Sequence, residues 1–168
     1  VQSKIIKWQK VPISAVSRVS QRILQIQRLK PTQVPLILEM GWSATCASRA
    51  SDHSSHHVLR LSLLRVRGTP LFYLRSTINQ QTKQNIATKI KEFLFSWSKL
   101  GFIHGDLSPR NILISTKPIL EIYFIDWVLD LQSFMATPYY SNEQVYKGKR
   151  CLSSDQYAAR KIVKWLLQ

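Results

Sequence analysis

The chain has 168 residues, 45% of them hydrophobic, so it can bury one sizeable core but is too short for several domains. Its 24 Lys and Arg residues outnumber 9 Asp and Glu residues, which gives a formal net charge of +15. The basic residues are spread along the chain, so we expect a folded basic surface that attracts an acidic partner. Every apolar run is far shorter than the roughly 20 residues of a membrane-spanning helix, which excludes a transmembrane segment.

Cysteine usage and the first residue bear on the cellular compartment. Cys46 and Cys151 lie far apart and outside any metal-binding pattern, which fits a reducing cytosol. The sequence begins with Val1 and shows no leader pattern, so we expect a fragment or a processed form from which a targeting signal could have been removed.

The first third of the chain is expected to combine strands with one helix. Apolar residues recur every three to four positions from Ile13 to Leu29, which predicts an amphipathic helix that stops at Pro31. Residues 34–40 form a short, mostly apolar run typical of a strand, and residues 42–55 are uneven and polar, as in a loop. Residues 57–64 alternate apolar and polar side chains, which predicts a second strand.

The rest of the chain is expected to hold a turn, two helices and two strands. Gly68 to Pro70 predicts the turn. One face of residues 80–100 is apolar and Gly101 follows in the C-cap position, which predicts a long helix. The remaining elements are two short strands and a final helix, at residues 112–114, 122–125 and 153–167.

One segment carries a dense set of chemistry-bearing residues. It reads His-Gly-Asp-Leu-Ser-Pro-Arg-Asn over residues 104–111, between the long helix and the strand pair. The spacing His-x-Asp-x4-Asn is expected by chance only about 0.003 times in a chain of this composition. This segment resembles the catalytic loop of protein kinases.

Three later positions also fit the protein kinase pattern. Asp126 ends a predicted strand, where kinases place a second metal-binding aspartate, and Asp155 opens a predicted helix, where they carry a structural aspartate. Residues 137–143, Thr-Pro-Tyr-Tyr-Ser-Asn-Glu, resemble the substrate-pocket segment that normally ends in Pro-Glu. Together with Asp106 and Glu143, these positions place four of the nine carboxylates on kinase positions in the right order.

The resemblance implies a Mg²⁺-dependent transfer of the γ-phosphoryl group of ATP, in which catalysis is positioning and charge neutralisation. Asp106 would accept or orient the substrate hydroxyl, and Asn111 and Asp126 would hold Mg²⁺ against the phosphates. His104 would fix the loop by packing and hydrogen bonding, and Asp155 would hold the loop backbone.

The resemblance also implies a strand lysine over the phosphates, and here the upstream half of the chain fits less well. Lys7 is preferred because it has apolar neighbours on both strand faces, whereas the alternative, Lys4, would place Gln2 where adenine needs an apolar floor. No acid precedes Glu39, so the usual helix glutamate is missing or replaced by glutamine, and no Gly-x-Gly-x-x-Gly motif occurs. The apolar residues expected to line the nucleotide are Ile5, Leu64, Val66 and Leu113.

The motif leaves the acceptor partly open. Ser108 stands where serine/threonine kinases usually carry lysine, whereas Arg110 stands where tyrosine kinases carry arginine. Thr137, followed by proline, favours a serine or threonine acceptor. Gly105 replaces the arginine that an activation-loop phosphate neutralises in many kinases, so we expect activity that needs no activating phosphorylation.

Among protein kinases, the chain is similar to the minimal type III effector kinases of the OspG/NleH family and to a plant-pathogen relative that modifies a host chaperone. The likeness runs from Arg60 to Leu167, and residues 64–71 would be the hinge. It implies an α+β, protein-kinase-like, two-lobed fold formed by a single domain. The N-lobe would occupy residues 1–67, and a minimal C-lobe at 68–168 would end after the helix opened by Asp155.

The same likeness implies partners and a location. We expect a monomeric effector, secreted into the host cytoplasm or otherwise cytoplasmic, that acts on an acidic host protein of a signalling, ubiquitin or chaperone pathway. A basic face on the last helix could dock such a partner, through Arg160, Lys161 and Lys164. The five tryptophans lie on apolar faces and are expected in the core, so no specific nucleic acid partner is predicted.

Two other functions stay open. The His-Gly-Asp-x4-Asn pattern, followed by Ile-Asp-Trp at residues 125–127, also resembles aminoglycoside, choline and lipopolysaccharide sugar kinases, which phosphorylate small molecules. The substrate-pocket segment and Asp155 argue against that class. A pseudokinase, a binding module that has lost catalysis, would explain the missing helix glutamate and glycine loop, but it needs neither a base nor two metal ligands.

Overall fold

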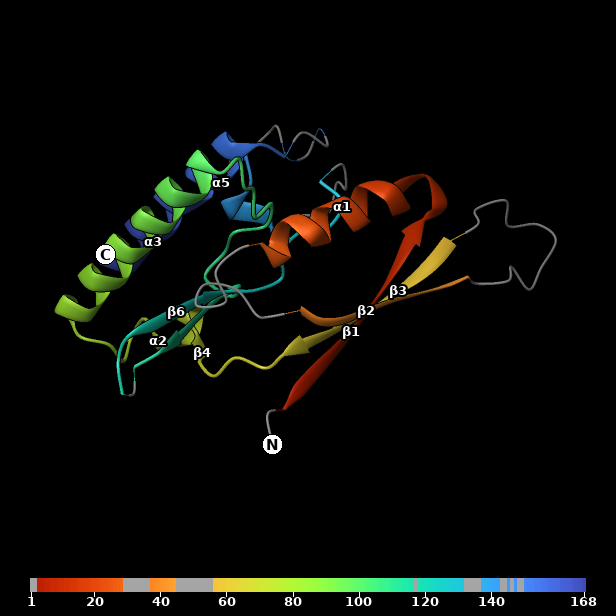
Figure 1. Ribbon diagram of the computed structural model, residues 1–168. Helices are drawn as coiled ribbons and strands as arrows, with labels where there is room; N and C mark the ends of the chain where they lie inside the picture. Colours follow the sequence, from red (N-terminus) through yellow and green to blue (C-terminus); the bar gives the residue numbers. More distant parts are fainter. Residues whose placement is uncertain are drawn as a thin grey trace. The chain divides into compact units, whose positions relative to one another are not determined.

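The computed structural model describes residues 3–28, 37–44, 56–116, 118–131, 137–142, 145, 147 and 150–168 (Figure 1). The chain divides into two compact units, Val1–Val66 and Arg67–Gln168. Both units contain helices and strands, which confirms the predicted α+β class. Within the described ranges, no helix is long and apolar enough to cross a membrane.

The first unit is built on a three-stranded antiparallel sheet with the order β1-β3-β2. Its strands are β1 (Lys4–Pro12), β2 (Ile37–Ala44) and β3 (His56–Leu64). β3 lies where alternation predicted it, but β2 continues through Trp42, where a loop was expected. Trp42 pairs with Leu59 of β3, so pairing with a neighbouring strand extends β2 over residues that carry no strand pattern of their own.

The predicted first helix is present as a short 3-10 turn, η1 (Ile13–Ala15), followed by α1 (Val16–Gln27). The buried apolar side chains of α1 are Val19, Ile23 and Ile26. Arg22 is buried in the same stripe, and its Nη1 donates a hydrogen bond to Oε1 of Gln25 at 3.5 Å. On the helix where kinases carry a glutamate, the chain therefore has an arginine paired with a glutamine.

The second unit contains a small antiparallel sheet with the order β4-β5-β6. Its strands are β4 (Thr69–Pro70), β5 (Ile112–Ser115) and β6 (Glu121–Phe124). β5 and β6 are the predicted strand pair, whereas β4 replaces part of the turn expected at 68–70 because it pairs with Ile114 and Leu113. Gly68 permits this approach, since a Cβ atom on it would lie 3.1 Å from both the Ile114 carbonyl oxygen and the Leu113 Cβ.

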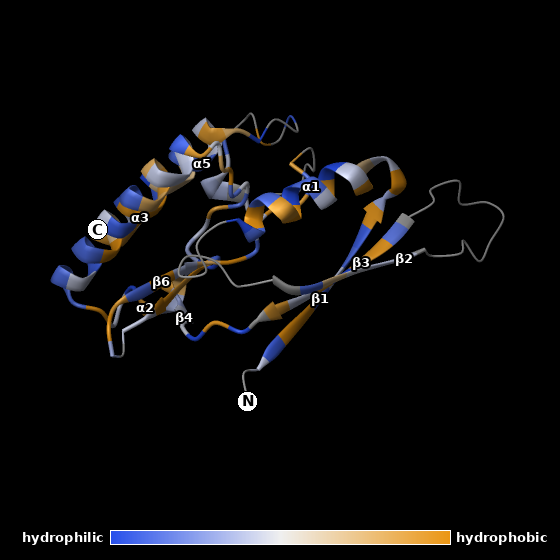
Figure 2. Ribbon diagram, viewed as in Figure 1, coloured by the Kyte–Doolittle hydropathy of each residue, from blue (hydrophilic) through white to orange (hydrophobic). Residues whose placement is uncertain are grey.

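Two long helices, α3 (Gln80–Lys99) and α5 (Leu152–Leu167), pack against each other in the second unit (Figure 1). Hydrophilic and hydrophobic residues alternate along both helices, as expected when one face is buried (Figure 2). Asn79 caps α3, because its side-chain oxygen accepts a hydrogen bond from the Thr82 N–H at 2.8 Å. Gly101 follows α3 with a φ of 68°, the left-handed conformation typical of a glycine at a helix C-terminus.

The shorter helical segments of this unit are α2 (Leu71–Leu74) and η2 (Pro138–Tyr140). Its core contains an aromatic cluster, in which the Trp97 ring lies 4.5 Å from Phe124 and 4.8 Å from Trp127. All three side chains are buried, as predicted for Trp97 and Trp127. Trp8 on β1 differs from the prediction, because it is 62% exposed and lies under the guanidinium of Arg60 instead of in the core.

Candidate active site

The loop at residues 104–111 is held by the carboxylate of Asp155 in the first turn of α5. The two Asp155 oxygens accept hydrogen bonds from the backbone N–H groups of His104 and Gly105, the second at 3.0 Å. Asp155 is only 2% exposed, so these charge-assisted bonds form away from water. The structure thus places Asp155 where the kinase resemblance expects it, on the backbone of the loop.

His104 connects the loop to the core. Its buried ring contacts the Ile125 carbonyl oxygen through Nε2 at 2.9 Å, and its Nδ1 accepts from the Asp106 N–H at 3.3 Å. A backbone N–H can only donate and a carbonyl can only accept, so these contacts require the tautomer with hydrogen on Nε2. The ring also lies 4.7 Å from that of Trp127. His104 therefore fixes the loop against the segment that carries Asp126.

The Asp106 carboxylate is oriented from two sides. Its Oδ1 accepts a hydrogen bond from the Thr137 N–H at 2.8 Å, and its Oδ2 accepts one from the Asn111 side-chain amide at 3.2 Å. The same amide donates to the Asp106 carbonyl oxygen at 2.8 Å. Three predicted site residues from two parts of the chain therefore meet here. A fixed, half-buried carboxylate with further lone pairs can accept the proton of an incoming hydroxyl group.

Asn111 and Asp126 are linked through the backbone of Ile125. The Ile125 N–H donates to the Asn111 carbonyl oxygen at 2.9 Å, and Asp126 follows directly with a φ of 58°, a conformation uncommon outside glycine. Asp126 is exposed, and the Asn111 amide nitrogen is engaged by Asp106, so the Asn111 side-chain oxygen is the atom that can bind a cation. An amide oxygen and a carboxylate are ligands that suit Mg²⁺, which takes few protein ligands when phosphates complete its shell.

Arg150, just before α5, is a site residue that the sequence reasoning missed. It was counted among the dispersed basic residues, but it is only 6% exposed, and its Nε donates to the Gly105 carbonyl oxygen at 2.8 Å. Burial lowers the pKa of its guanidinium. The charges of three carboxylates oppose this change in pKa, those of Asp106, Asp130 and Asp155. Gly105 was the signal available in the sequence. Because it stands where the catalytic loop of many kinases has an arginine, a cation from another part of the chain must balance the charges of these carboxylates.

Gly105 leaves no room for a side chain at its own position. Its φ is 89°, and a Cβ atom on it would lie 2.9 Å from the Val128 Cβ and 3.0 Å from the Arg150 Cδ. The Val128 N–H in turn donates to the His104 carbonyl oxygen at 3.0 Å. The Trp127 indole N–H donates to the Phe124 carbonyl oxygen at 2.9 Å. The segment after Asp126 is therefore tied to the loop by both packing and hydrogen bonds.

The two candidate lysines lie on β1 of the first unit. Lys7 is half-buried near the middle of the strand, where it pairs with Leu61 of β3. Lys4 instead forms an exposed ion pair with Glu39 of β2, with 3.6 Å between nitrogen and oxygen. Such pairs contribute little to stability, but this one gives Lys4 a partner in its own sheet. The choice of Lys7 as the phosphate-binding lysine stays a prediction.

The other predicted residues are spread over both units. Ile5 is 47% exposed on β1, and Leu64 is the last residue of β3. Val66 and Leu113 are half-buried. Their role in nucleotide binding stays a prediction. Glu143 lies outside the described residues.

Comparison with solved structures shows a protein-kinase-like fold. The chain is similar to a crystal structure of Rad53 residues 1–466 in complex with AMP-PNP, with a TM-score of 0.65 and 17% sequence identity. The likeness covers 96% of this chain and 40% of that chain, so the protein spans well under half the length of the structure it matches. At this identity the likeness establishes the fold alone.

A family model for the RIO domain matches residues 50–137. The chain belongs to the RIO domain family. The part matched to the RIO domain contains Asp106, Asn111 and Asp126 and ends at Thr137, whereas Asp155 lies beyond it. RIO domains form an atypical protein kinase family, which confirms the predicted kinase relationship at the level of the superfamily. The finer resemblance to the OspG/NleH effectors stays a prediction, and no curated protein matches the chain.

Proposed function

We propose that this RIO domain is an ATP-dependent phosphotransferase that uses Mg²⁺. The observation that carries the proposal is the Asp106 carboxylate, which is oriented by hydrogen bonds from Thr137 and Asn111. Phosphoryl transfer depends on such positioning, together with neutralisation of the phosphate charge. Membership of the RIO family and the kinase-like fold support the activity, and the AMP-PNP in the Rad53 structure supports ATP as the phosphoryl donor.

Each residue of the loop region has a separate task in this proposal. Asp106 accepts the proton of the acceptor hydroxyl as the hydroxyl oxygen bonds to the γ-phosphorus of ATP and the bond from that phosphorus to the bridging oxygen breaks, which releases ADP. Asn111 and Asp126 hold Mg²⁺, which neutralises phosphate charge when it is bound. Asp155 and Arg150 touch neither reactant and act by holding the backbone of His104 and Gly105.

We propose a serine or threonine of an acidic protein as the acceptor. The Thr137 N–H contacts Asp106, and in the protein kinases that this region resembles, the corresponding segment forms the protein substrate pocket. A small-molecule kinase has no need of that contact. The net charge of +15 supports an acidic protein partner.

Activity without an activating phosphorylation is part of the same proposal. In many kinases, a phosphate on the activation loop neutralises an arginine of the catalytic loop, but Gly105 occupies the position of that arginine here. The cation beneath the loop is Arg150, whose charge already interacts with Asp106, Asp130 and Asp155. The charges around the catalytic loop are therefore balanced by groups that the chain itself supplies.

The decisive experiment is transfer of γ-labelled phosphate from Mg-ATP to the chain itself and to proteins of a eukaryotic cell lysate. Asp126→Ala and Asp106→Asn serve as controls, with thermal melts to show that both variants fold. We expect labelled protein bands that both substitutions remove. Phosphoamino acid analysis of the bands then tests the proposed serine or threonine acceptor.

Two results would contradict the proposal. ATP binding without transfer to any protein or small acceptor would identify a pseudokinase. Transfer only to small molecules, such as aminoglycosides, would keep the phosphotransferase but overturn the protein acceptor.

A further inference from the structure

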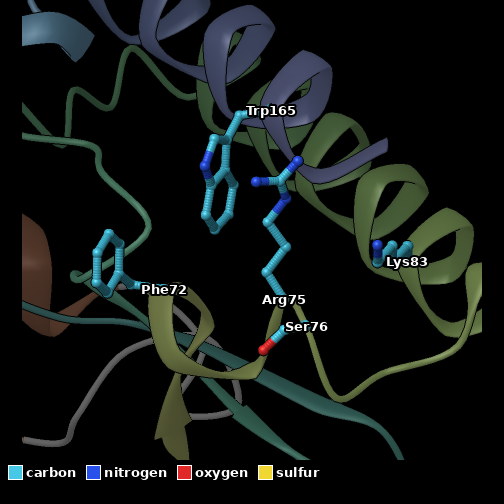
Figure 3. A pocket seen from close by; sticks show the side chains of 5 residues that line it. All are labelled: Phe72, Arg75, Ser76, Lys83 and Trp165. Atoms are coloured by element: carbon cyan, nitrogen blue, oxygen red, sulfur yellow. The ribbon is translucent and has the colours of Figure 1, made fainter. Parts of the chain in front are cut away.

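A cavity of about 380 Å³ in the second unit is not explained by the transfer reaction. It is lined by Phe72, Arg75, Ser76, Lys83 and Trp165. These residues come from α2 and the turn after it, from α3 and from α5, so no single sequence motif describes the cavity. Trp165 extends from α5 between Phe72 and Arg75, and Lys83 projects from α3 (Figure 3). We call this cavity the cationic pocket.

The aromatic side chains give the cationic pocket a defined wall. The rings of Phe72 and Trp165 are nearly parallel, with an interplanar angle of 5° and 6.3 Å between centroids. The Arg75 guanidinium carbon lies 4.9 Å from the Trp165 ring centroid. A guanidinium that lies on an aromatic face is held in position and still has N–H groups for an anion.

The charge of the cationic pocket has one sign. Arg75 and Lys83 both line it, Ser76 adds a hydroxyl group, and no carboxylate is among its lining residues. Within the part of the chain that the structure describes, neither cation forms an ion pair. Two positive charges in one concave site raise the local concentration of anions and favour a bound carboxylate or phosphate group.

The cationic pocket adjoins the candidate active site. The Phe72 N–H donates to the carbonyl oxygen of Pro109 in the catalytic loop at 3.1 Å. The Arg110 guanidinium carbon, two residues from Ser108, lies 4.4 Å from the Phe72 ring centroid. Arg75 also acts on Tyr140, since its charge opposes the rise in the pKa of that phenol caused mainly by burial. The Phe72 wall of the cationic pocket therefore contacts the loop that carries Asp106.

We propose that the cationic pocket binds an acidic side chain of the protein substrate, close to the serine or threonine that receives the phosphate. Arg75 and Lys83 are then specificity-determining residues, because they select acceptor sites flanked by a carboxylate or by a phosphorylated residue. The volume is at the lower end of ligand sites, which suits a single side chain with its flanking backbone. This inference rests on the proposed function, but peptide binding tests it without any transfer step.

The test measures the binding of three fluorescent peptides by anisotropy, without ATP. All contain one serine acceptor, and they differ only in the flanking residues, which are glutamine, glutamate or phosphoserine. We expect the glutamate or the phosphoserine peptide to bind about tenfold more tightly than the glutamine peptide. The comparison of the two anionic peptides shows which group the cationic pocket prefers.

Matched variants separate this site from the general positive charge. Arg75→Gln and Lys83→Gln should each remove most of the preference for the anionic peptide. Lys99→Gln, an exposed position at the end of α3 that does not line the cationic pocket, removes the same charge and should leave the preference intact. Thermal melts of the full chain check that all three variants fold.

Three results would overturn the inference. Equal binding of all peptides would show that no acidic side chain is recognised. An equal loss in the Lys99→Gln variant would show general charge attraction. Tighter binding of a single-stranded oligonucleotide, with the same dependence on Arg75, would assign the cationic pocket to nucleic acid. None of these results bears on whether Asp106 catalyses transfer, which the labelling experiment decides.

Discussion

The catalytic loop and the cationic pocket lie next to each other but are built in opposite ways. In the loop, His104 and Gly105 are held by the buried carboxylate of Asp155, and the side chain of Asp106 accepts two hydrogen bonds. In the cationic pocket, Arg75 and Lys83 form no ion pair among the described residues. The difference teaches that groups for bond making are fixed by the fold, whereas groups for recognition are left for a partner to neutralise.

The comparison predicts that the largest effect on stability and phosphate transfer comes from substitution of Asp155, which anchors the catalytic loop. Asp155→Ala removes the acceptor of two buried N–H groups, and each unsatisfied group costs about 1–3 kcal/mol. We expect the free energy of unfolding to fall by about 3 kcal/mol in all, which lowers the urea midpoint. We also expect phosphate transfer to be lost. Gln156→Ala, at the exposed neighbouring position, should leave both unchanged. An Asp155→Ala protein as stable as the parent would show that the anchor is dispensable.

The second effect separates chemistry from stability inside the loop. Asp106→Asn keeps an oxygen for the Thr137 N–H and loses only the longer bond, at 3.2 Å, from the Asn111 amide, so we expect the melting temperature to stay within a few degrees. Transfer should fall by about 10²–10⁴, the usual contribution of a general base. Nucleotide binding, followed by a fluorescent ATP analogue, should not change. If transfer persists at the parent rate, Asp106 has no part in the reaction.

A smaller effect is expected from substitution of Arg150, the buried cation that contacts the catalytic loop. Arg150→Gln should reduce transfer and stability together, because the Gly105 carbonyl loses its donor and the charges of Asp106 and Asp155 lose a balancing cation. An effect of about 1.5–3 kcal/mol on unfolding is usual for a hydrogen bond to a charged group. Lys99→Gln, an exposed change of the same charge, should have none. Matching urea curves for the two variants would refute a structural role for Arg150.

The smallest effect concerns Cys151 at the start of α5, which belongs to neither region. Its sulfur lies 3.0 Å from the Ser153 hydroxyl oxygen, and hydrogen bonding with Ser153 and Ser154 lowers the pKa of the thiol below the ordinary value of 9.0. In a Cys46→Ser background, the rate of alkylation should therefore reach half its maximum below pH 9.0. Ser153→Ala should move that midpoint upward.

The lower pKa of the Cys151 thiol in the folded state also sets the sign of a stability effect. Its contribution is fully present above the pKa of the unfolded thiol and is lost as the pH falls through the folded pKa. Compared with a Cys151→Ser variant, the parent should gain stability as the pH rises towards about 9. An equal pH dependence of both proteins would contradict the assignment.

Local pattern was enough for the helices and for the catalytic loop. The amphipathic repeat at 80–100, with a glycine after it, corresponds to α3, and the paired strands after the loop correspond to β5 and β6. The spacing of His104, Asp106 and Asn111 identified the loop because these residues are close in the sequence and are joined by hydrogen bonds within one short loop. Information of this kind is contained in neighbouring residues, so a single sequence displays it.

The tertiary structure alone decided what depends on distant residues. The extension of β2 through Trp42 needs β3 as a partner, and Arg150 is buried because Gly105, far away in the chain, leaves it space. The cationic pocket draws its side chains from three helices and the turn after one of them, in positions that carry no motif. The sequence by itself therefore determined the fold class and the catalytic loop. It also pointed to Asp155 as the anchor of the loop, whereas the burial of Arg150 against Gly105 and the cationic pocket arise only when segments without any shared local pattern pack together.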